Sequence, residues 1–513
     1  MKFNMKINTV FALVMFSIII ILSRLQTYDG LLGLDTVTYS VIANELLEGR
    51  SLYTDLWDHK PPAIHLTFAA VQALVGQGPQ SFFLLSSFAS ILTLLGVYSA
   101  ASAEGRGARV GLWAAAIWAV ISRQVYLDSD SPNTEEFINV CVIWTFALFL
   151  RAEEAFRDWK KVVIAGALFA LASLYKPVAV VVAIVFSLVH LFFTRGNKTE
   201  RRRAFFQVSI MAAVGVGAWV MTAGYFFFQN RFADFYYAVF EFNQNYAGNP
   251  VQNIVKGFQG KYLYRWFLSP LLLLFAISSI GVLLSLKNKI SRSHAMMAGY
   301  VLSVIVMISL PGRYFAHYYQ FWLPLLALSS AWSLQVVVDQ LKNNNFASSN
   351  IIVSTFLVIQ LFLQVITYTQ YQQRWNTAYF GGYRVVKNLS KTMGSLLLPE
   401  ETFHAFGFGV GLFYYTQQSP QTGLIATWGL KNGTRASQFI ERLKRDLSTP
   451  AVDLLVVDTW FLKSIANYKD LLINYTKFPG ENKYFPFELY YLKGSPLEKR
   501  LLSNPLREQY DNG

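Results

Sequence analysis

The stretch "LWDHKPPAIHL", residues 56–66, gathers reactive side chains outside the first hydrophobic segment of the chain. Asp58, His59 and Lys60 directly precede Pro61-Pro62. Two prolines stop a helix before them and are tolerated in the first turn of the next one. Lys60 is therefore predicted to lie in an extended segment ahead of an interfacial helix. A lysine ammonium in that place suits a phosphate oxygen of a lipid head group.

The alternative interpretation is a lysine that reaches the membrane surface and binds lipids non-specifically. Asp58 disfavours it, because a purely electrostatic anchor would not keep an acid two residues away. Three roles stay open for Asp58 and His59: they position Lys60, cap the next helix or contact an acceptor molecule. His65 follows on an apolar helix and is predicted to be structural or interfacial.

A second reactive position is Asp35, near the start of "GLDTVTYSVIANELLEG", residues 33–49. Apolar residues recur there three and four positions apart, which predicts an amphipathic helix that lies along the membrane surface. Asp35 is either an N-cap that accepts backbone N–H groups or a catalytic carboxylate. The sequence leaves both interpretations open.

Four carboxylates cluster in the short segment "YLDSDSPNTEEF", residues 126–137: Asp128, Asp130, Glu135 and Glu136. Acidic residues in the first turn of a helix stabilise that end. Four acids are more than capping needs, so the segment is also a candidate for binding a divalent cation or orienting an acceptor.

Two further cations are predicted at the same membrane face. Lys176 in "LYKPVAV" repeats the Lys-Pro pair, and Arg313 in "LPGRYFAHYYQFWLPLLAL" precedes His317 and Tyr318. A guanidinium offers a planar fork to phosphate. Lys60, Lys176 and Arg313 are therefore predicted to form one cationic pocket. All three are predicted on the outer side of the membrane, where the positive-inside rule expects few Lys or Arg residues, and this favours a functional role.

These residues must be positioned by a membrane-embedded scaffold. The 513-residue chain is 54% hydrophobic and 14% charged, against roughly 25% charged residues in soluble domains. Its net charge of +14 is assigned to Lys and Arg in the links between apolar runs, so no nucleic-acid partner is predicted. One cysteine and six histidines disfavour a disulfide framework and a His-rich metal site.

Eleven apolar segments are predicted to cross the membrane, and alternate links carry the Lys and Arg residues. The first is interpreted as an uncleaved span with a cytoplasmic N-terminus. Residues 1–367 form the transmembrane part, with a first external loop at 26–80 that carries interfacial helices. The predicted spans are 9–25, 81–101, 109–123, 136–150, 162–175, 178–194, 205–228, 268–286, 295–311, 318–336 and 350–367.

Residues 368–513 differ in character and are predicted to form an extracytoplasmic α/β domain. Strands are predicted at "ETFHAFGFG", "TGLIATWG" and "AVDLLVVDT", with a helix at "ASQFIERLKRDL". The Gly-rich "FGFGVG" at 406–411 follows a predicted strand without the lysine of a phosphate loop, so a turn is predicted there.

The opening "GLDTVTYSVIANELLEGRSLYTDLWDHKPPAIHL" resembles the bacterial membrane glycosyltransferases of family 39 type, as do "PNTEEF" and "RYFAHYYQFWLP". These enzymes are similar to dolichyl-phosphate-mannose protein mannosyltransferases and to the aminoarabinose transferase that modifies lipid A. The resemblance covers roughly residues 8–370. It implies a polytopic α-helical GT-C fold in the cytoplasmic (inner) membrane and a polyprenyl-phosphate-linked sugar as donor.

The resemblance also implies roles for individual residues. Asp35 matches the position of the general base or acceptor-orienting acid, and Lys60 matches the lysine associated with the lipid phosphate. The protein mannosyltransferases have Asp-Glu where this chain has Asp35-Thr36. The resemblance therefore gives no particular support to a protein acceptor, and it leaves the acceptor undetermined among lipid, glycan and protein.

The implied chemistry is an inverting transfer of a hexosyl or pentosyl unit on the outer side of the membrane. A carboxylate takes the proton of the attacking hydroxyl, and cations balance the leaving phosphate. No cofactor is required, although a divalent cation is an option. The alternatives are a transporter or flippase for lipid-linked glycans, an O-antigen-type ligase, and a non-catalytic membrane scaffold.

Overall fold

The computed structural model describes residues 7–28, 32–129, 131–194, 198–285, 291–343, 349–374, 378–425, 428–431, 433–448, 451–459, 463, 465, 468–478 and 486–503. The chain divides into two compact units. The first consists of Met1–Tyr28, Phe82–Tyr225 and Ala247–Gln372. The second consists of Asp29–Ser81, Phe226–Tyr246 and Gln373–Gly513.

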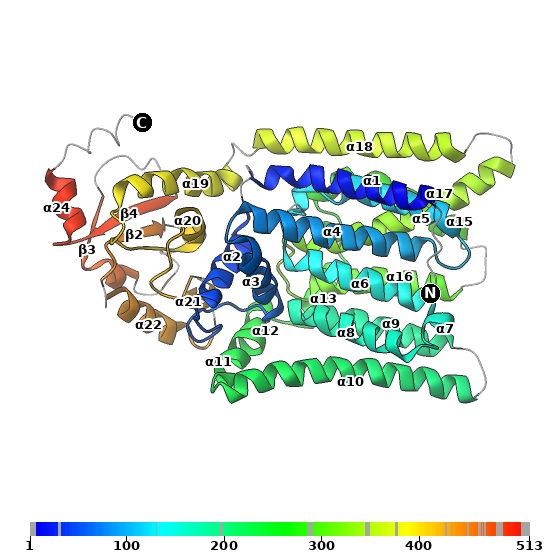
Figure 1. Cartoon of the computed structure of the whole chain (residues 1–513), viewed down its shortest axis with the longest axis horizontal. Coiled ribbons are helices and arrows are strands. Elements are labelled where there is room, and N and C mark those ends of the chain that lie inside the picture. The colour runs from blue at the N-terminus through cyan, green and yellow to red at the C-terminus, as the bar shows by residue number, and fades with distance from the viewer. Residues whose placement is uncertain are drawn as a thin grey trace. The chain divides into compact units, whose positions relative to one another are not determined.

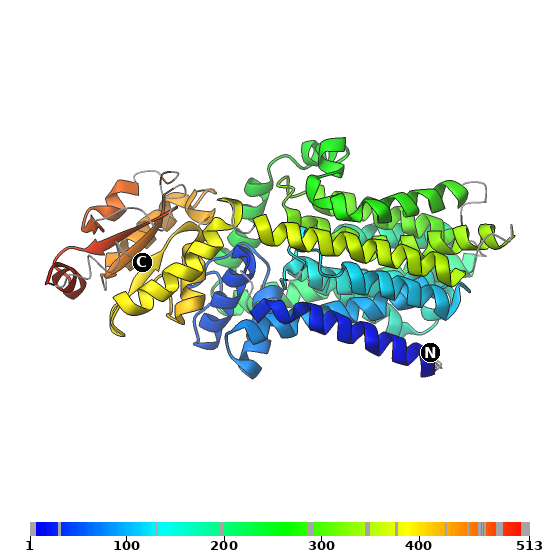
Figure 2. The same cartoon turned by 90° about the horizontal axis from the view of Figure 1, so that it is seen from above.

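The first unit is a bundle of long helices that run side by side (Figures 1 and 2). Each predicted span coincides with one of them. These helices are α1 (Ile7–Arg24), α4 (Pro79–Ala101), α5 (Gly107–Ile121), α6 (Thr134–Leu150), α8 (Trp159–Tyr175), α9 (Val180–Phe193), α10 (Lys198–Phe228), α15 (Leu272–Ser285), α16 (Arg292–Ser309), α17 (Trp322–Asn343) and α18 (Ser349–Arg374).

Short helices connect the long ones at their ends. They are η1 (Leu25–Tyr28), η2 (Val125–Leu127), α7 (Ala152–Ala155), η3 (Pro177–Ala179), α13 (Pro250–Gly257), α14 (Gly260–Leu263), η5 (Trp266–Leu271) and η6 (Ala316–Phe321).

The length and hydropathy of the long helices are those of a multi-pass membrane protein, as predicted. Within the described residues, 7 helical stretches of 18 or more residues are apolar enough to cross a membrane. Gly107–Ile121 and Pro177–Phe193 are apolar but shorter. Helices pack closely where small residues allow it: a Cβ atom on Gly166 of α8 would lie 3.0 Å from the Met211 Cα of α10.

A fully buried arginine ties four of these helices together. Arg24, the last residue of α1, donates through Nε to Ser86 Oγ of α4 at 2.8 Å and through Nη2 to the Ser122 carbonyl after α5 at 3.1 Å. Its Nη2 also lies 3.4 Å from Glu136 Oε1 in the first turn of α6. Glu136, predicted as a metal- or acceptor-positioning acid, is therefore the partner of a buried cation that would be costly to leave unpaired.

The second unit combines two helices of the first external loop with a small mixed sheet. The loop forms α2 (Leu34–Leu47) and α3 (Ala63–Val75), and a later segment adds α11 (Phe232–Tyr236), η4 (Tyr237–Glu241) and α12 (Phe242–Ala247). The C-terminal part adds α19 (Ala378–Leu396), η7 (Gly407–Val410), α20 (Gly411–Thr416), α21 (Trp428–Lys431), α22 (Ala436–Ser448), η8 (Tyr468–Leu472) and α24 (Pro496–Ser503).

The sheet has the order β1-β2-β4-β3, from β1 (Phe403–Ala405), β2 (Leu454–Asp458), β4 (Phe487–Leu492) and β3 (Tyr475–Lys477). β1 runs parallel to β2, with Phe403 opposite Leu454, and the other two pairings are antiparallel. Every residue of β2 is buried, which is expected of a strand whose two faces are both covered. Leu455 and Val457 face α22, whereas Phe403 stacks on Phe413 of α20.

The predictions for this part were correct in class and incomplete in detail. The strands expected in "ETFHAFGFG" and "AVDLLVVDT" and the helix at 436–447 are confirmed. Where a turn is predicted after the first strand, the chain forms the short 3-10 helix η7, which leads into α20. The strand expected in "TGLIATWG" is wrong, since residues 422–425 form bends and turns. β3 and β4 have no counterpart in the prediction.

Helix α2 also differs from its prediction. An amphipathic helix with an exposed polar face was expected, but most of α2 is buried, including Thr36, Ser40 and Glu45. Gln72 of α3 donates to Ser40 Oγ at 2.7 Å, so polar residues of α2 are satisfied inside the unit. The apolar spacing could not reveal that the polar face would also be covered.

Trp57 is the residue around which the second unit packs. Its ring is 1% exposed and lies 5.0 Å from the Phe242 ring of α12 and 5.3 Å from the Phe439 ring of α22. Its backbone N–H donates to the Gly423 carbonyl at 2.9 Å. The first loop, the α11–α12 segment and the C-terminal part therefore share one core, which also includes Leu424, Leu430, Leu443, Leu447, Leu455 and Val457.

We expect Trp57→Ala to destabilise the protein by about 3–5 kcal/mol, the usual effect of truncating a large buried aromatic side chain. The measurement is thermal unfolding of the purified protein in detergent. Trp159, which is 65% exposed, provides the matched control, and Trp159→Ala should leave the unfolding temperature nearly unchanged. Equal shifts for the two variants would contradict this account of the core.

Candidate functional site

A small cavity in the second unit brings together residues from three parts of the sequence. It has a volume of ≈ 30 Å³ and is lined by Asp35 from α2, by residues 58–60 ahead of α3 and by residues after β1. The lining residues are Leu34, Asp35, Thr38, Tyr39, Asp58, His59, Lys60, Gly407, Val410 and Ile425. A volume of that size holds about one water molecule, so it admits a hydroxyl group or a phosphate oxygen and not a whole sugar.

Asp35 occupies the first turn of α2 but does not cap it. The N-cap position belongs to Gly33, which has extended backbone angles and no side-chain cap hydrogen bond. The Asp35 side chain is half-buried and lines the cavity. The capping interpretation of this residue is therefore wrong, and the carboxylate lies at the positive end of the helix dipole.

Lys60 reaches the same cavity from the segment before α3. It is 8% exposed, and its carbonyl accepts a hydrogen bond from the Tyr53 hydroxyl at 2.8 Å. The two prolines follow, and α3 begins at Ala63 with Pro62 as its N-cap, as the sequence predicts. Lys60 Nζ lies 3.4 Å from His59 Nε2.

The Asp58 carboxylate is buried between two imidazoles. His59 Nδ1 lies 3.3 Å from Asp58 Oδ1, and His65 Nε2 lies 3.1 Å from Asp58 Oδ2. The His59 backbone N–H donates to Oδ1 at 2.7 Å. Burial by itself would raise the pKa of Asp58, but these contacts outweigh it and hold the pKa well below its usual range. Asp58 is therefore an anion at neutral pH.

His59 lies between that anion and the lysine. Burial lowers the pKa of His59, and the neighbouring Lys60 ammonium lowers it further, against the opposing effect of Asp58 and Asp35. Its ring lies 5.4 Å from the Phe242 ring and 5.6 Å from the Tyr246 ring. The imidazole is therefore neutral at pH 7.

His65 also contacts Asp58, although the sequence predicts only a structural or interfacial role for it. It is fully buried, in the first turn of α3. The signal was present in the spacing, because a helix that starts directly after Pro62 turns position 65 back toward position 58. A histidine on an apolar helix is common in protein cores, so the sequence favoured the structural interpretation.

Two of the predicted residues of the first unit form a buried ion pair. Lys176, between α8 and η3, pairs with Glu135 of α6, and its ammonium lies 4.0 Å from the centre of the Tyr318 ring. Thr134 Oγ1 donates to the other Glu135 oxygen at 2.9 Å. The positive charge of Lys176 is therefore balanced within the protein.

The other predicted residues of the first unit lie in, before or against the segment that forms η6. Arg313 is exposed. His317 packs against Phe315 and edge-on to Tyr318, with ring centres 4.7 Å apart for the second pair. Asp128 has a left-handed backbone with φ 50°, and its carbonyl accepts a hydrogen bond from Gln320 at 3.0 Å.

Asp130 lies outside the described residues. Among the residues that the structure describes, no three His, Cys, Asp or Glu side chains are grouped as a metal site would require. Glu135 and Glu136, which the sequence placed in one acidic cluster, each face a cation instead. The prediction that Lys60, Lys176 and Arg313 share one pocket stays a prediction, because Lys60 belongs to the other unit.

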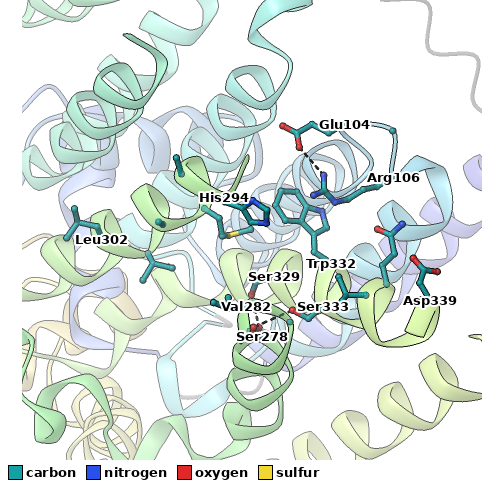
Figure 3. Close-up of a pocket in the computed structure, with 18 of the residues that line it drawn as sticks. Glu104, Arg106, Ser278, Val282, His294, Leu302, Ser329, Trp332, Ser333 and Asp339 are labelled. Atoms are coloured by element: carbon teal, nitrogen blue, oxygen red, sulfur yellow. Dashed lines mark hydrogen bonds and ion pairs between the residues drawn. The ribbon is translucent and has the colours of Figure 1, made fainter. Parts of the chain in front are cut away.

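A much larger cavity of ≈ 980 Å³ lies in the first unit among α15, α16 and α17. Apolar side chains such as Val282 and Leu302 line most of it, and Ser278 bonds to Ser329 within it at 2.8 Å (Figure 3). At its polar end, the Arg106 guanidinium lies 4.0 Å from the centre of the Trp332 ring. None of the predicted site residues that the structure describes lines this cavity, and its apolar wall suits lipid chains better than a sugar.

Residues 59–221 match the family described as dolichyl-phosphate-mannose-protein mannosyltransferase. The match spans less than half of the chain. It begins at His59 and includes Lys60, Glu135 and Lys176. No curated protein matches the sequence.

Solved structures give a more extensive likeness. ArnT from Cupriavidus metallidurans bound to undecaprenyl phosphate has a TM-score of 0.64 at 15% identity, and the comparison covers 95% of this chain and 98% of that one. The archaeal oligosaccharyltransferase AglB from Archaeoglobus fulgidus, in complex with an inhibitory peptide and a dolichol-phosphate, has a TM-score of 0.55 at 15% identity, with coverage of 92% and 72%. The arabinofuranosyltransferase AftD from Mycobacteria has a TM-score of 0.51 at 11% identity, with coverage of 95% and 40%.

At these identities the structures establish the fold. The chain is a polytopic α-helical membrane protein with the GT-C fold of these glycosyltransferases, and residues 59–221 match the protein mannosyltransferase family.

Proposed function

We propose that this protein is an inverting glycosyltransferase that moves a sugar from a polyprenyl-phosphate donor to an acceptor hydroxyl. The observation that carries the proposal is that Asp35 and Lys60 line one cavity, although they belong to different segments of the first loop. This transfer requires a carboxylate that takes the proton of the acceptor hydroxyl and a cation that balances the charge of the phosphate. The GT-C fold and the family match support the same reaction class.

Asp35 is proposed as the general base. The acceptor hydroxyl loses its proton as its oxygen attacks the anomeric carbon, and a carboxylate within hydrogen-bond reach takes that proton. The bond from the anomeric carbon to the phosphate oxygen breaks on the opposite face of the sugar, so the configuration inverts. A glycosidase would need two paired carboxylates, one of which protonates the leaving group.

Lys60 is proposed to stabilise the leaving polyprenyl phosphate. A phosphate leaves without being protonated if a cation balances its negative charge, and a preorganised ammonium in a water-poor site does so effectively. Lys176 and Arg313 are proposed as further contacts to the phosphate. Reaction on the outer side of the cytoplasmic membrane, with the C-terminal domain outside, is part of this proposal and rests on the distribution of Lys and Arg in the links.

We expect Asp35→Asn to lower the transfer rate by about 10²–10⁴-fold, the contribution of a general base, and not to weaken binding of undecaprenyl phosphate, since the variant removes a negative charge near Lys60. Mass spectrometry of glycolipids from cells with and without the protein first identifies the transferred sugar. The variant is then compared with the wild type in that assay. Glu48→Gln, at the exposed end of the same helix, is the matched control.

Full glycan transfer by a well-expressed Asp35→Asn variant would remove the proposed mechanism. The absence of any change in lipid-linked or surface glycans, when cells with and without the protein are compared, would remove the proposed function.

The Glu135–Lys176 pair allows a second test. Because the pair is buried, Lys176→Met leaves an unpaired carboxylate and should destabilise the protein by about 3–5 kcal/mol, whereas Lys176→Met combined with Glu135→Met should regain most of that stability. If Lys176 contacts the donor phosphate, the stable double variant binds undecaprenyl phosphate about tenfold more weakly than wild type, since a charge-assisted hydrogen bond is lost. Binding of wild-type strength in the double variant would exclude Lys176 from the phosphate site.

A further inference from the structure

Three adjacent residues, Asp58, His59 and Lys60, form a chain of contacts whose direction is dictated by their chemistry. A carboxylate only accepts hydrogen bonds, and an ammonium only donates them. A neutral imidazole between the two must therefore carry its proton on the nitrogen that faces the carboxylate. Nδ1 faces Asp58 at 3.3 Å and Nε2 faces Lys60 Nζ at 3.4 Å, so His59 is the Nδ1–H tautomer and Nε2 accepts from the lysine.

We infer that Asp58 and His59 are positioning residues, which fix one N–H of Lys60 on the imidazole and thereby set the direction of its ammonium toward the donor phosphate. The inference rests on the proposed function for the identity of that phosphate. Of the three roles that the sequence leaves open for this pair, it assigns the positioning of Lys60. It also explains why Asp58 lies two residues from Lys60, where a non-specific lipid anchor would not need an acid.

The surroundings of His59 are suited to hold the ring in one orientation. Its ring packs against Phe242 and Tyr246 of α12, and its carbonyl accepts a hydrogen bond from Asn243 Nδ2 at 2.7 Å. His65 Nε2 lies 3.1 Å from the second oxygen of Asp58 without hydrogen-bond geometry. The His59 backbone N–H, which donates to the first oxygen at 2.7 Å, holds the carboxylate beside the imidazole that it orients.

The titratable and charged groups that face His59 come from several elements. Asp58 and Lys60 flank it in its own segment, Asp35 of α2 acts on it electrostatically, and Tyr246 of α12 packs on its ring. If His59 gains a proton, Nε2 becomes a donor and opposes the ammonium of Lys60. The positioning of Lys60 is therefore present when His59 is neutral and is lost as the pH falls through its pKa.

Because the pKa of His59 is lowered, the positioning of Lys60 is lost only at acid pH. Because burial and Lys60 lower that pKa from its usual value, the fall in phosphate binding should lie below about pH 6.5, the ordinary value for histidine. At neutral pH the arrangement is intact.

A first experiment tests the contact chain without any substrate. The protein is labelled with ¹⁵N-histidine, and the tautomer of each of the six histidines is determined by NMR at about pH 7. The His59 signal is identified by its loss in His59→Gln. We expect His59 to be neutral with the proton on Nδ1, and a signal with the proton on Nε2, or on both nitrogens, would overturn the inference.

A second experiment measures the effect on the phosphate. Binding of undecaprenyl phosphate to the full chain in detergent is compared between wild type, His59→Leu and His59→Gln over about pH 5–8, the range in which histidine titrates. His59→Leu should bind about tenfold more weakly at neutral pH, because one hydrogen bond to a charged group is lost. Glutamine has both a donor and an acceptor, so His59→Gln should restore most of the affinity and, since it cannot titrate, abolish the fall on the acid side.

The control is Glu48→Gln, which replaces an exposed acid at the end of α2 and should behave as wild type at every pH. Wild-type affinity and pH dependence in both His59 variants would overturn the positioning role while leaving the proposed function intact. A wild-type protein that does not bind undecaprenyl phosphate at all would count against the proposed function, and the tautomer measurement would still decide the contact chain.

Discussion

The carboxylate of Asp58 is the constraint on which the candidate site depends. An anion buried in a protein must be matched by hydrogen bonds or by opposite charge. The His59 backbone N–H donates to Asp58 Oδ1, and the His59 and His65 ring nitrogens lie 3.3 Å and 3.1 Å from the carboxylate. Lys60 follows this segment directly and lines one cavity with Asp35.

The surrounding core explains why this polar group is rigid. Trp57 packs among residues of α12, α21 and α22, so the segment before Asp58 is anchored by the C-terminal part of the chain. Arg442 of α22 donates to the Asp55 carbonyl at 2.9 Å, which adds a polar anchor to the apolar one. The C-terminal α/β layer therefore stabilises the conformation of the first loop.

Buried charges in the helical bundle follow the same rule. Arg24 faces Glu136, and Lys176 faces Glu135. Both carboxylates occupy the first turn of α6, where the helix dipole favours negative charge. Glu135 and Glu136 are adjacent in sequence but pair with different cations, because consecutive helical residues point in different directions. Two of the four acids in this segment, Glu135 and Glu136, thus form ion pairs in a setting where unpaired charge is unfavourable.

Apolar runs alone predict the long helices of the first unit, because a bilayer requires segments that satisfy their own backbone groups, and each predicted span falls on one of these helices. The start of α3 is also predictable, since prolines end a helix before them and are tolerated in the first turn of the next. Local patterns could not predict that Gly33 and not Asp35 is the N-cap of α2, that α2 is buried, that Lys176 faces Glu135 and that His65 lies against Asp58. Those outcomes depend on which segments meet in space, and neither apolar spacing nor local propensity records that.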